Sequence, residues 1–419
     1  MRVARPCLLG AVLIGSACGG PTAQQAVDAG ADTTVDAGTA DVLPERTSID
    51  AAADTTVDVG AADAVNDGTP IDGGDDACSG MLCTGVCVDT QTDATNCGRC
   101  GHDCCGGQCS AGVCQPVSLS GVVEPYSLAL QTPNLFWVSE ASGGQVFRLP
   151  IGIGQTSSPL ATTGVNASVP GGLAVNADSV FWLGSAGISS CLQTGCGGSP
   201  TVIAPGVPTG SGVSIAADAN NVYFVESPGG VFQCPVTGCT GPPTSLAPGP
   251  PGPTGVAVDD ANVYWVVVGT SSALEACTIG GCSASPVALT TFPYLNGQIA
   301  LAGASIFASA FDFEGGGVTG VIECAKTGCG NAPSVFYQYT SASGDFPTDI
   351  AADSTNVYWG GGNQTSPLLS CPVSGCVGAP TVLAPNWNGG SIALDSSCVY
   401  WMAYDPNDDN GAVMRVAKP

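Results

Sequence analysis

Apolar and polar positions follow a ten-residue pattern that occurs seven times after residue 115 of this 419-residue chain. Each copy has an aliphatic run, a polar turn and an aromatic run, which is the pattern of a β-hairpin. The copies align without gaps as LALQTPNLFW (128–137), LAVNADSVFW (173–182), IAADANNVYF (215–224), VAVDDANVYW (256–265), IALAGASIFA (299–308), IAADSTNVYW (350–359) and IALDSSCVYW (392–401). A glycine-marked stretch and a further short strand, such as PTVLAP at 380–385, follow the hairpin. The pattern therefore predicts seven units of four strands, named a to d in chain order.

Repeats at a period of roughly forty residues indicate an array or a propeller, and four strands per unit favour a β-propeller. The last unit ends at RVAKP without a d strand, whereas QPVSLSG at 115–121 precedes the first unit as a spare strand. We expect this N-terminal strand to complete the last blade and close the ring. The segments resemble YWTD- and NHL-type propeller repeats. The resemblance implies an all-β, seven-bladed propeller but no particular function, because such folds host many functions.

A C-x4-C motif recurs five times at the predicted turn between strands c and d, for example CPVTGC at 234–239. A short loop brings facing residues within disulfide reach. Zinc would need more ligands, and a redox site typically has C-x2-C spacing. The spacing therefore predicts five disulfides within the pairs Cys191 and Cys196, Cys234 and Cys239, Cys277 and Cys282, Cys324 and Cys329, and Cys371 and Cys376. The first and last blades carry Arg148 and Arg415 near the first cysteine position.

The N-terminus has the pattern of a secretory signal over residues 1–17, with two arginines, a short apolar run and small residues before Cys18. The segment GSAC resembles a bacterial lipobox, which implies lipidation of Cys18 and, with Gly19 next, an outer-membrane destination. Gly15 departs from the usual Leu or Val of that motif. Plain secretion with an incidental Cys18 is the alternative.

Residues 18–77 are rich in Ala, Asp, Thr, Val and Gly and contain no aromatic residue, so we expect a disordered acidic linker. Residues 78–114 hold nine cysteines, which in an exported chain predict a disulfide-rich module. A zinc site at NCGRC with His102 is the alternative. The run CVDTQTDATNCGRCG resembles small cysteine-rich modules of bacterial surface lipoproteins. Cys398 is the unpaired cysteine of the propeller, 115–419, and we hypothesise that it bonds one cysteine of the module.

Acidic residues outnumber basic ones by 34 to 8, and the formal net charge is -26. Nucleic-acid binding is excluded, because so few cations cannot neutralise a run of phosphates. The single histidine, His102, lies in the cysteine-rich segment, so the propeller cannot contain a Ser-His-Asp site. The repeated Asn or Asp of the hairpins (Asn176, Asp218, Asp259, Asp353 and Asp395) is interpreted as a turn former.

In YDPNDDNG at 404–411, Asp405, Asn407 and Asp409 alternate as in calcium loops. The motif departs from the calcium pattern at Asn410, where glycine is usual, and a polar turn is the alternative. No other cofactor is predicted.

Insertions in the later blades bring aromatic residues to the d–a and b–c connections, which share one face of a propeller. The predicted ligand-binding residues are Phe311, Phe313, Tyr337, Tyr339, Trp387 and Tyr404, with Phe346 and Tyr294 nearby. Exposed aromatic rings among carboxylates suit binding of a sugar or a peptide. We therefore expect a lipid-anchored binding or scaffold protein of the outer membrane or cell surface, with a glycan or protein ligand. A carboxylate-type polysaccharide lyase or hydrolase, and a purely structural envelope lipoprotein, are the alternatives; the sequence leaves catalysis undecided.

Overall fold

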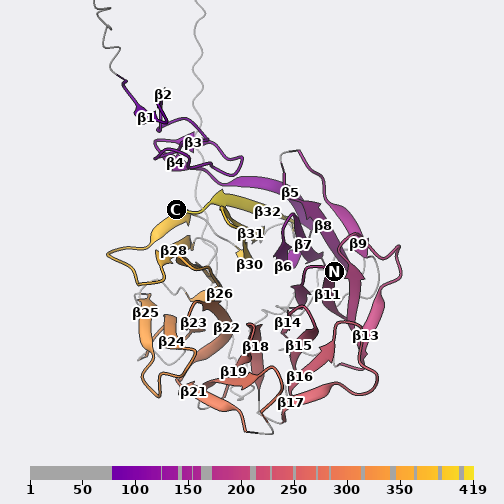
Figure 1. Ribbon diagram of the computed structural model, residues 1–419. Helices are drawn as coiled ribbons and strands as arrows, with labels where there is room; N and C mark the ends of the chain where they lie inside the picture. The colour runs from indigo at the N-terminus through magenta and orange to yellow at the C-terminus, as the bar shows by residue number, and fades with distance from the viewer. Residues whose placement is uncertain are drawn as a thin grey trace, which may run out of the picture. The chain divides into compact units, whose positions relative to one another are not determined.

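Seven four-stranded antiparallel sheets are arranged in a ring in the computed structural model of the chain (Figure 1). The structure describes residues 78–123, 125–139, 144–152, 154–161, 172–207, 214–226, 229–248, 252–269, 272–282, 285–312, 317–339, 346–362, 366–385, 389–404 and 410–419. No helix in these ranges is long and apolar enough to cross a membrane. The predicted seven-bladed, all-β propeller is confirmed.

Each of the first six blades is built from four consecutive strands. Blades 1 to 3 contain β6 (Pro125–Gln131), β7 (Asn134–Ser139), β8 (Gln145–Pro150) and β9 (Ser158–Ala161); β10 (Leu173–Val175), β11 (Ser179–Gly184), β12 (Gly187–Leu192) and β13 (Thr201–Pro205); and β14 (Ile215–Ala217), β15 (Asn221–Glu226), β16 (Gly230–Pro235) and β17 (Thr244–Pro248). Blades 4 to 6 contain β18 (Pro253–Val258), β19 (Asn262–Val267), β20 (Ala273–Thr278) and β21 (Val287–Thr291); β22 (Leu295–Ala302), β23 (Ser305–Ala310), β24 (Gly320–Ala325) and β25 (Ser334–Gln338); and β26 (Pro347–Ala352), β27 (Asn356–Gly361), β28 (Leu368–Pro372) and β29 (Thr381–Ala384).

The seventh blade joins the two ends of the propeller. It contains β30 (Gly389–Leu394), β31 (Cys398–Tyr404) and β32 (Asn410–Ala417), and its outer strand is β5 (Val117–Val123) from before the first blade. In the ladder of β32 and β5, Arg415 lies opposite Val117 and Asn410 lies opposite Val123. The inner strand β30 also contacts β6 of blade 1, so the ring closes. The predicted closing strand is confirmed, and it extends two residues beyond the expected end at 121.

Aromatic residues of the b strands form the core between the blades. The tryptophans that end five of the seven hairpin segments are all buried, namely Trp137, Trp182, Trp265, Trp359 and Trp401. Side chains alternate across a strand, so every second residue of a b strand packs against one neighbouring blade and the residues between them pack against the other. In blade 4, Trp265 packs with Tyr223 and Val225 of blade 3, while Tyr264 packs with Ile306 of blade 5.

The a–b turns follow a rule that pairs a buried tyrosine with an aspartate. In blade 3 the Asp218 Oδ1 atom accepts hydrogen bonds from the backbone amides of Asn220 and Asn221, and Oδ2 accepts one from the Tyr223 hydroxyl at 2.7 Å. Blades 4, 6 and 7 repeat the pair as Tyr264 with Asp259, Tyr358 with Asp353 and Tyr400 with Asp395. In the other three blades Phe replaces the tyrosine, and Gln, Asn or Ala replaces the aspartate. The interpretation of these acids as turn formers is confirmed.

Two lysines extend this pair into a contact between blades. Lys326 Nζ of blade 5 lies 2.8 Å from Asp259 Oδ2 of blade 4, and 5.8 Å from the ring centre of Tyr264. Lys418 makes the same contact between blades 7 and 6, at 2.6 Å from Asp353 Oδ2. Burial alone would raise the pKa of Asp259, but the hydrogen bonds from Lys326, two backbone amides and Tyr264 lower it to about 2.

The five short disulfides link the cysteines of each C-x4-C motif. They differ from the expected arrangement, because the second cysteine lies in the c–d turn and not opposite the first in the ladder. In blade 3, for example, Cys234 is in β16 and lies opposite Val222, while Cys239 precedes β17. The Cys239 amide donates a hydrogen bond to the Ile203 carbonyl of blade 2 at 2.8 Å. Cys329 of blade 5 donates in the same way to the Leu289 carbonyl of blade 4 at 2.9 Å. In these two blades the disulfide, one of five that we call staples, thus shapes a turn that reaches the preceding blade.

The cysteine-rich module of residues 78–114 has two small hairpins, β1 (Met81–Cys83) with β2 (Val86–Val88) and β3 (Cys109–Ser110) with β4 (Val113–Cys114). Four disulfides lie within it, joining Cys78 to Cys87, Cys83 to Cys100, Cys97 to Cys109 and Cys104 to Cys114. The fifth joins Cys105 to Cys398, the first residue of β31 after the a–b turn of blade 7. The hypothesis that Cys398 bonds the module is therefore confirmed.

We predict that the Cys105–Cys398 disulfide contributes more to stability than any one staple. It closes a loop with a sequence separation of 293 residues, whereas a staple separates its cysteines by 5. The chain-entropy relation gives about 6 kcal/mol for the long loop and about 2 kcal/mol for the short one. Guanidinium unfolding without reductant should show the larger loss in the C105S/C398S variant than in C234S/C239S. Equal losses would contradict the prediction.

The pairing of tyrosine with aspartate predicts a coupling that can be built into blade 5. Phe307→Tyr places a hydroxyl at a fully buried position whose turn residue is Ala302, and should cost about 1–3 kcal/mol. Adding Ala302→Asp should restore about 1 kcal/mol, because the acid accepts the hydroxyl hydrogen bond. A double-mutant cycle measured by denaturant unfolding gives the coupling free energy. A value near zero would refute the rule.

Candidate functional site

A stacked pair of phenylalanines is the main aromatic feature that the structure describes on the face of the d–a and b–c connections, called the loop face. Phe311 follows β23 and Phe346 precedes β26, and their ring centres lie 4.3 Å apart. Both side chains are partly exposed. The Phe311 amide donates to the Tyr294 carbonyl at 2.7 Å, and the Gly362 amide donates to the Phe346 carbonyl at 2.8 Å. Backbone hydrogen bonds thus hold the pair between blades 5 and 6.

Asp312 shapes the turn beside this pair. Its Oδ2 atom accepts a hydrogen bond from the Gly317 amide, and its own amide donates to Thr319 Oγ1 at 3.1 Å. A Cβ on Gly317 would lie 3.1 Å from Asp312 Oδ2 and 3.2 Å from the Tyr294 ring. Asp312 is buried, and these two hydrogen bonds tie it to Gly317 and Thr319.

Tyr337 and Tyr339 lie at the end of the d strand of blade 5, β25. Tyr339 is only 8% exposed, so its ring belongs to the core between blades 5 and 6. The Tyr337 ring is partly buried and lies 5.1 Å from that of Tyr339 and 5.0 Å from that of Trp359. The sequence places both tyrosines at the start of an expected exposed insertion. In the structure, however, β25 continues to Gln338, and the two rings pack inward.

Several predicted residues lie outside the described residues. These are Phe313, Trp387 and the calcium-loop residues Asp405, Asn407 and Asp409, as well as Cys18 at the predicted lipidation position. Tyr404 ends β31, but its side chain is outside the described part. The glycan, calcium and lipid-anchor expectations that depend on them stay predictions.

The zinc alternative at the cysteine-rich module does not fit the structure. Cys97 and Cys100 of the C-x2-C motif belong to two different disulfides, with Cys109 and Cys83. The sulfurs of Cys97, Cys104 and Cys114 lie within 4.8 Å of one another, but each is already bonded to another sulfur. His102 Nδ1 lies 2.6 Å from the Cys97 carbonyl oxygen and Nε2 lies 2.8 Å from that of Lys418. The ring therefore ties the module to the end of the propeller.

Asp349 on the inner strand of blade 6 is a titratable residue that the sequence pattern did not single out. Its Oδ2 atom accepts a hydrogen bond from the Ile392 amide of blade 7 at 2.5 Å. Ser214 and Ser391 stand at the same repeat position and accept from the next blade's amide in the same way, at 3.2 and 3.0 Å. Burial raises the pKa of Asp349 to about 6, against the lowering effect of two backbone hydrogen bonds. The sequence signal that could have identified Asp349 is its position immediately before the ten-residue segment.

Comparisons with known proteins support the propeller fold and do not indicate a function. No family model matches the chain, and no curated protein matches it. A puromycin-hydrolysing peptidase of Mycobacterium tuberculosis superimposes with a TM-score of 0.51 at 13% identity, covering 70% of this chain and 51% of the peptidase. This chain thus spans about half of that protein's length. The likeness at this identity shows the propeller fold alone, and the YWTD or NHL type stays an expectation.

Two further solved structures are similar at lower scores. BamB from Moraxella catarrhalis gives a TM-score of 0.47 at 13% identity over 75% of this chain and 88% of BamB. YCF48 bound to D1 peptide gives 0.49 at 13% identity over 73% of this chain and 96% of YCF48.

We predict that Asp349 makes stability depend on pH. The folded-state pKa lies above the ordinary value for aspartate, so the folded state favours the protonated form. Its stabilising contribution is present below about pH 4 and is lost as the pH rises through about 6, by up to about 3 kcal/mol.

Asp349→Asn and Asp349→Ser should both remove this loss of stability at higher pH, and each keeps an acceptor for the Ile392 amide. Serine is the residue that blades 3 and 7 carry at this position. Unfolding free energies of the three proteins from acidic to neutral pH test the point. Parallel curves for all three would contradict it.

Proposed function

We propose that this chain is an exported, non-enzymatic binding or scaffold protein, lipid-anchored through Cys18, whose loop face holds a segment of a protein partner. The observation that carries the proposal is the partly exposed Phe311–Phe346 pair, stacked at 4.3 Å and held by backbone hydrogen bonds. Aromatic side chains fixed in place are typical anchors of interfaces, because little conformational entropy is lost when a partner packs on them.

The disulfides support the proposed location outside the cytoplasm. Ten disulfides are present in the described residues, and such bonds persist in oxidising environments outside the cytoplasm. The N-terminal apolar run before GSAC supports export and lipidation, and the acidic linker before residue 78 supports a spacer between the lipid and the folded domain.

The charge of the chain indicates the chemistry of the partner. The net charge is -26, and the two insertions next to the phenylalanine pair contain Glu314 and Asp345 but no Lys or Arg. A partner segment with an apolar side chain flanked by basic residues would be attracted to this face. A glycan is the second candidate ligand. Asp312, the acid beside the pair, already accepts a hydrogen bond from the Gly317 amide, so this oxygen is engaged within the protein and not by a sugar hydroxyl. This favours the protein ligand.

We predict that Phe311→Ala and Phe346→Ala each weaken binding of the partner by about tenfold or more, because truncating a central aromatic anchor typically costs about 2 kcal/mol. The measurement is quantitative capture of envelope proteins by the purified, oxidised chain, followed by affinity measurement with the captured partner. The rate of association should fall as salt is raised.

Leu192→Ala is the matched control, because Leu192 is an exposed apolar residue (58% exposed) on the opposite, stapled side of the propeller. It should leave capture unchanged. A glycan and cell-wall-fragment array, probed with the same proteins, tests the second candidate. Capture that is unaffected by both phenylalanine variants would refute the proposal, and an array signal lost in both would replace the protein ligand by a glycan.

A further inference from the structure

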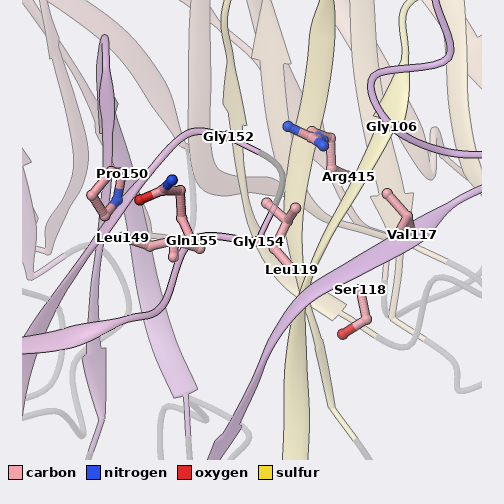
Figure 2. A pocket seen from close by; sticks show the side chains of 10 residues that line it. All are labelled: Gly106, Val117, Ser118, Leu119, Leu149, Pro150, Gly152, Gly154, Gln155 and Arg415. Carbon is pink, nitrogen blue, oxygen red and sulfur yellow. The ribbon is translucent and has the colours of Figure 1, made fainter.

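A pocket lies where the cysteine-rich module, the closing strand and blade 1 meet, on the stapled side of the propeller. Its volume is about 300 Å³, and it is lined by Gly106, Val117, Ser118, Leu119, Leu149, Pro150, Gly152, Gly154, Gln155 and Arg415 (Figure 2). These residues come from the module, from β5 and β32 of blade 7, and from the end of β8 and the turn after it. The pocket therefore exists only in the closed ring.

Arg415 is the charged group of this pocket, and it is only 6% exposed. Within the described residues its Nε atom has no hydrogen-bond partner. Burial and Asp395 raise the pKa of the Tyr400 hydroxyl, whereas a hydrogen bond from Arg415 lowers it, so one part of the guanidinium is held by Tyr400. Figure 2 shows the side chain extending toward the blade 1 turn at Gly152. A buried arginine stays charged, and a buried donor without an acceptor is costly.

Arg148 provides an internal comparison, because it occupies the same repeat position in blade 1. Arg148 lies opposite Phe136 in the ladder, as Arg415 lies opposite Tyr400. The Nε atom of Arg148 also has no hydrogen-bond partner within the described residues. Its Nη1 atom, however, donates to the Gln193 carbonyl at 3.0 Å, and the hollow beside it includes the acidic Asp178. None of the ten residues that line the Arg415 pocket is acidic. The two arginines thus differ in that only the Arg415 pocket lacks a carboxylate of its own.

The shape and chemistry of the pocket define a ligand class. An arginine presents Nε and Nη in one plane, which matches the two oxygens of a carboxylate. Val117, Leu119, Leu149 and Pro150 supply apolar wall, and Gln155 supplies an amide. A volume of about 300 Å³ is at the small end for ligand pockets and suits a molecule of about amino-acid size. We propose that this pocket binds small carboxylates with an apolar substituent, with Arg415 as the residue that recognises the carboxylate.

The test uses the full oxidised chain, with N-acetyl-leucine as the probe and N-acetyl-leucine amide as its neutral match. Binding is measured by ligand-observed NMR and by calorimetry. The wild-type chain should bind the acid, and the amide should bind at least about tenfold more weakly, because it offers no charged pair of oxygens. Arg415→Met should lose at least about tenfold in affinity for the acid, whereas Arg148→Met should bind like the wild type.

A second variant covers the case in which Arg415→Met does not fold. Leu119→Trp keeps the arginine and fills the pocket, so it should abolish binding while the disulfide pattern and thermal unfolding remain those of the wild type. Absence of binding to the wild type at millimolar probe, or unchanged binding in Leu119→Trp, would overturn the proposal. Inorganic phosphate that competes as well as N-acetyl-leucine would overturn the assignment to carboxylates.

Discussion

The pairing of β5 with β32 is the constraint on which the rest of this structure depends. These strands lie almost three hundred residues apart in the chain, yet they share one ladder, with Arg415 opposite Val117. Without this ladder the last blade would end in an exposed edge and blades 7 and 1 would not be held together. The disulfide between Cys105 and Cys398 and the contact of His102 with the Lys418 carbonyl act at the same junction. Hydrogen bonds and a covalent bond therefore close the ring at one place.

Between the other blades, the same few repeat positions are used in different ways. The turn aspartate orders its own hairpin, accepts the buried tyrosine hydroxyl and, in blades 4 and 6, also pairs with a lysine of the next blade. Staples shape the c–d turns, and at Cys239 the turn's amide reaches the preceding blade. The position before each hairpin segment adds the hydrogen bonds of Ser214, Asp349 and Ser391 along the inner strands. The chain has only two lysines, and both pair with a partly buried carboxylate of a neighbouring blade.

The two faces of the propeller differ in what they present. The stapled side carries the short disulfides, the cysteine-rich module and the buried Arg415, and it is built mainly from tight turns. The loop side carries the longer connections of the later blades and the stacked pair of Phe311 and Phe346. Backbone hydrogen bonds to Tyr294 and from Gly362 hold Phe311 and Phe346 in place. Fixed placement of this kind allows the two rings to bind a ligand without a large ordering cost.

The sequence by itself determined the hairpins, the seven-fold repeat and the five C-x4-C pairs, because these depend on alternation and spacing within about forty residues. It also indicated the closing strand, because the last unit lacks a d strand and a spare strand precedes the first unit. The tertiary structure decided which side chains face a ligand. Tyr339 looks like part of an exposed insertion, but the twist and register of β25 bury it between two blades. The partner of Cys398 and the pocket at Arg415 likewise involve residues brought together only by ring closure. The missing d strand revealed the closing contact, but these other contacts between distant segments leave no local pattern from which one sequence could predict them.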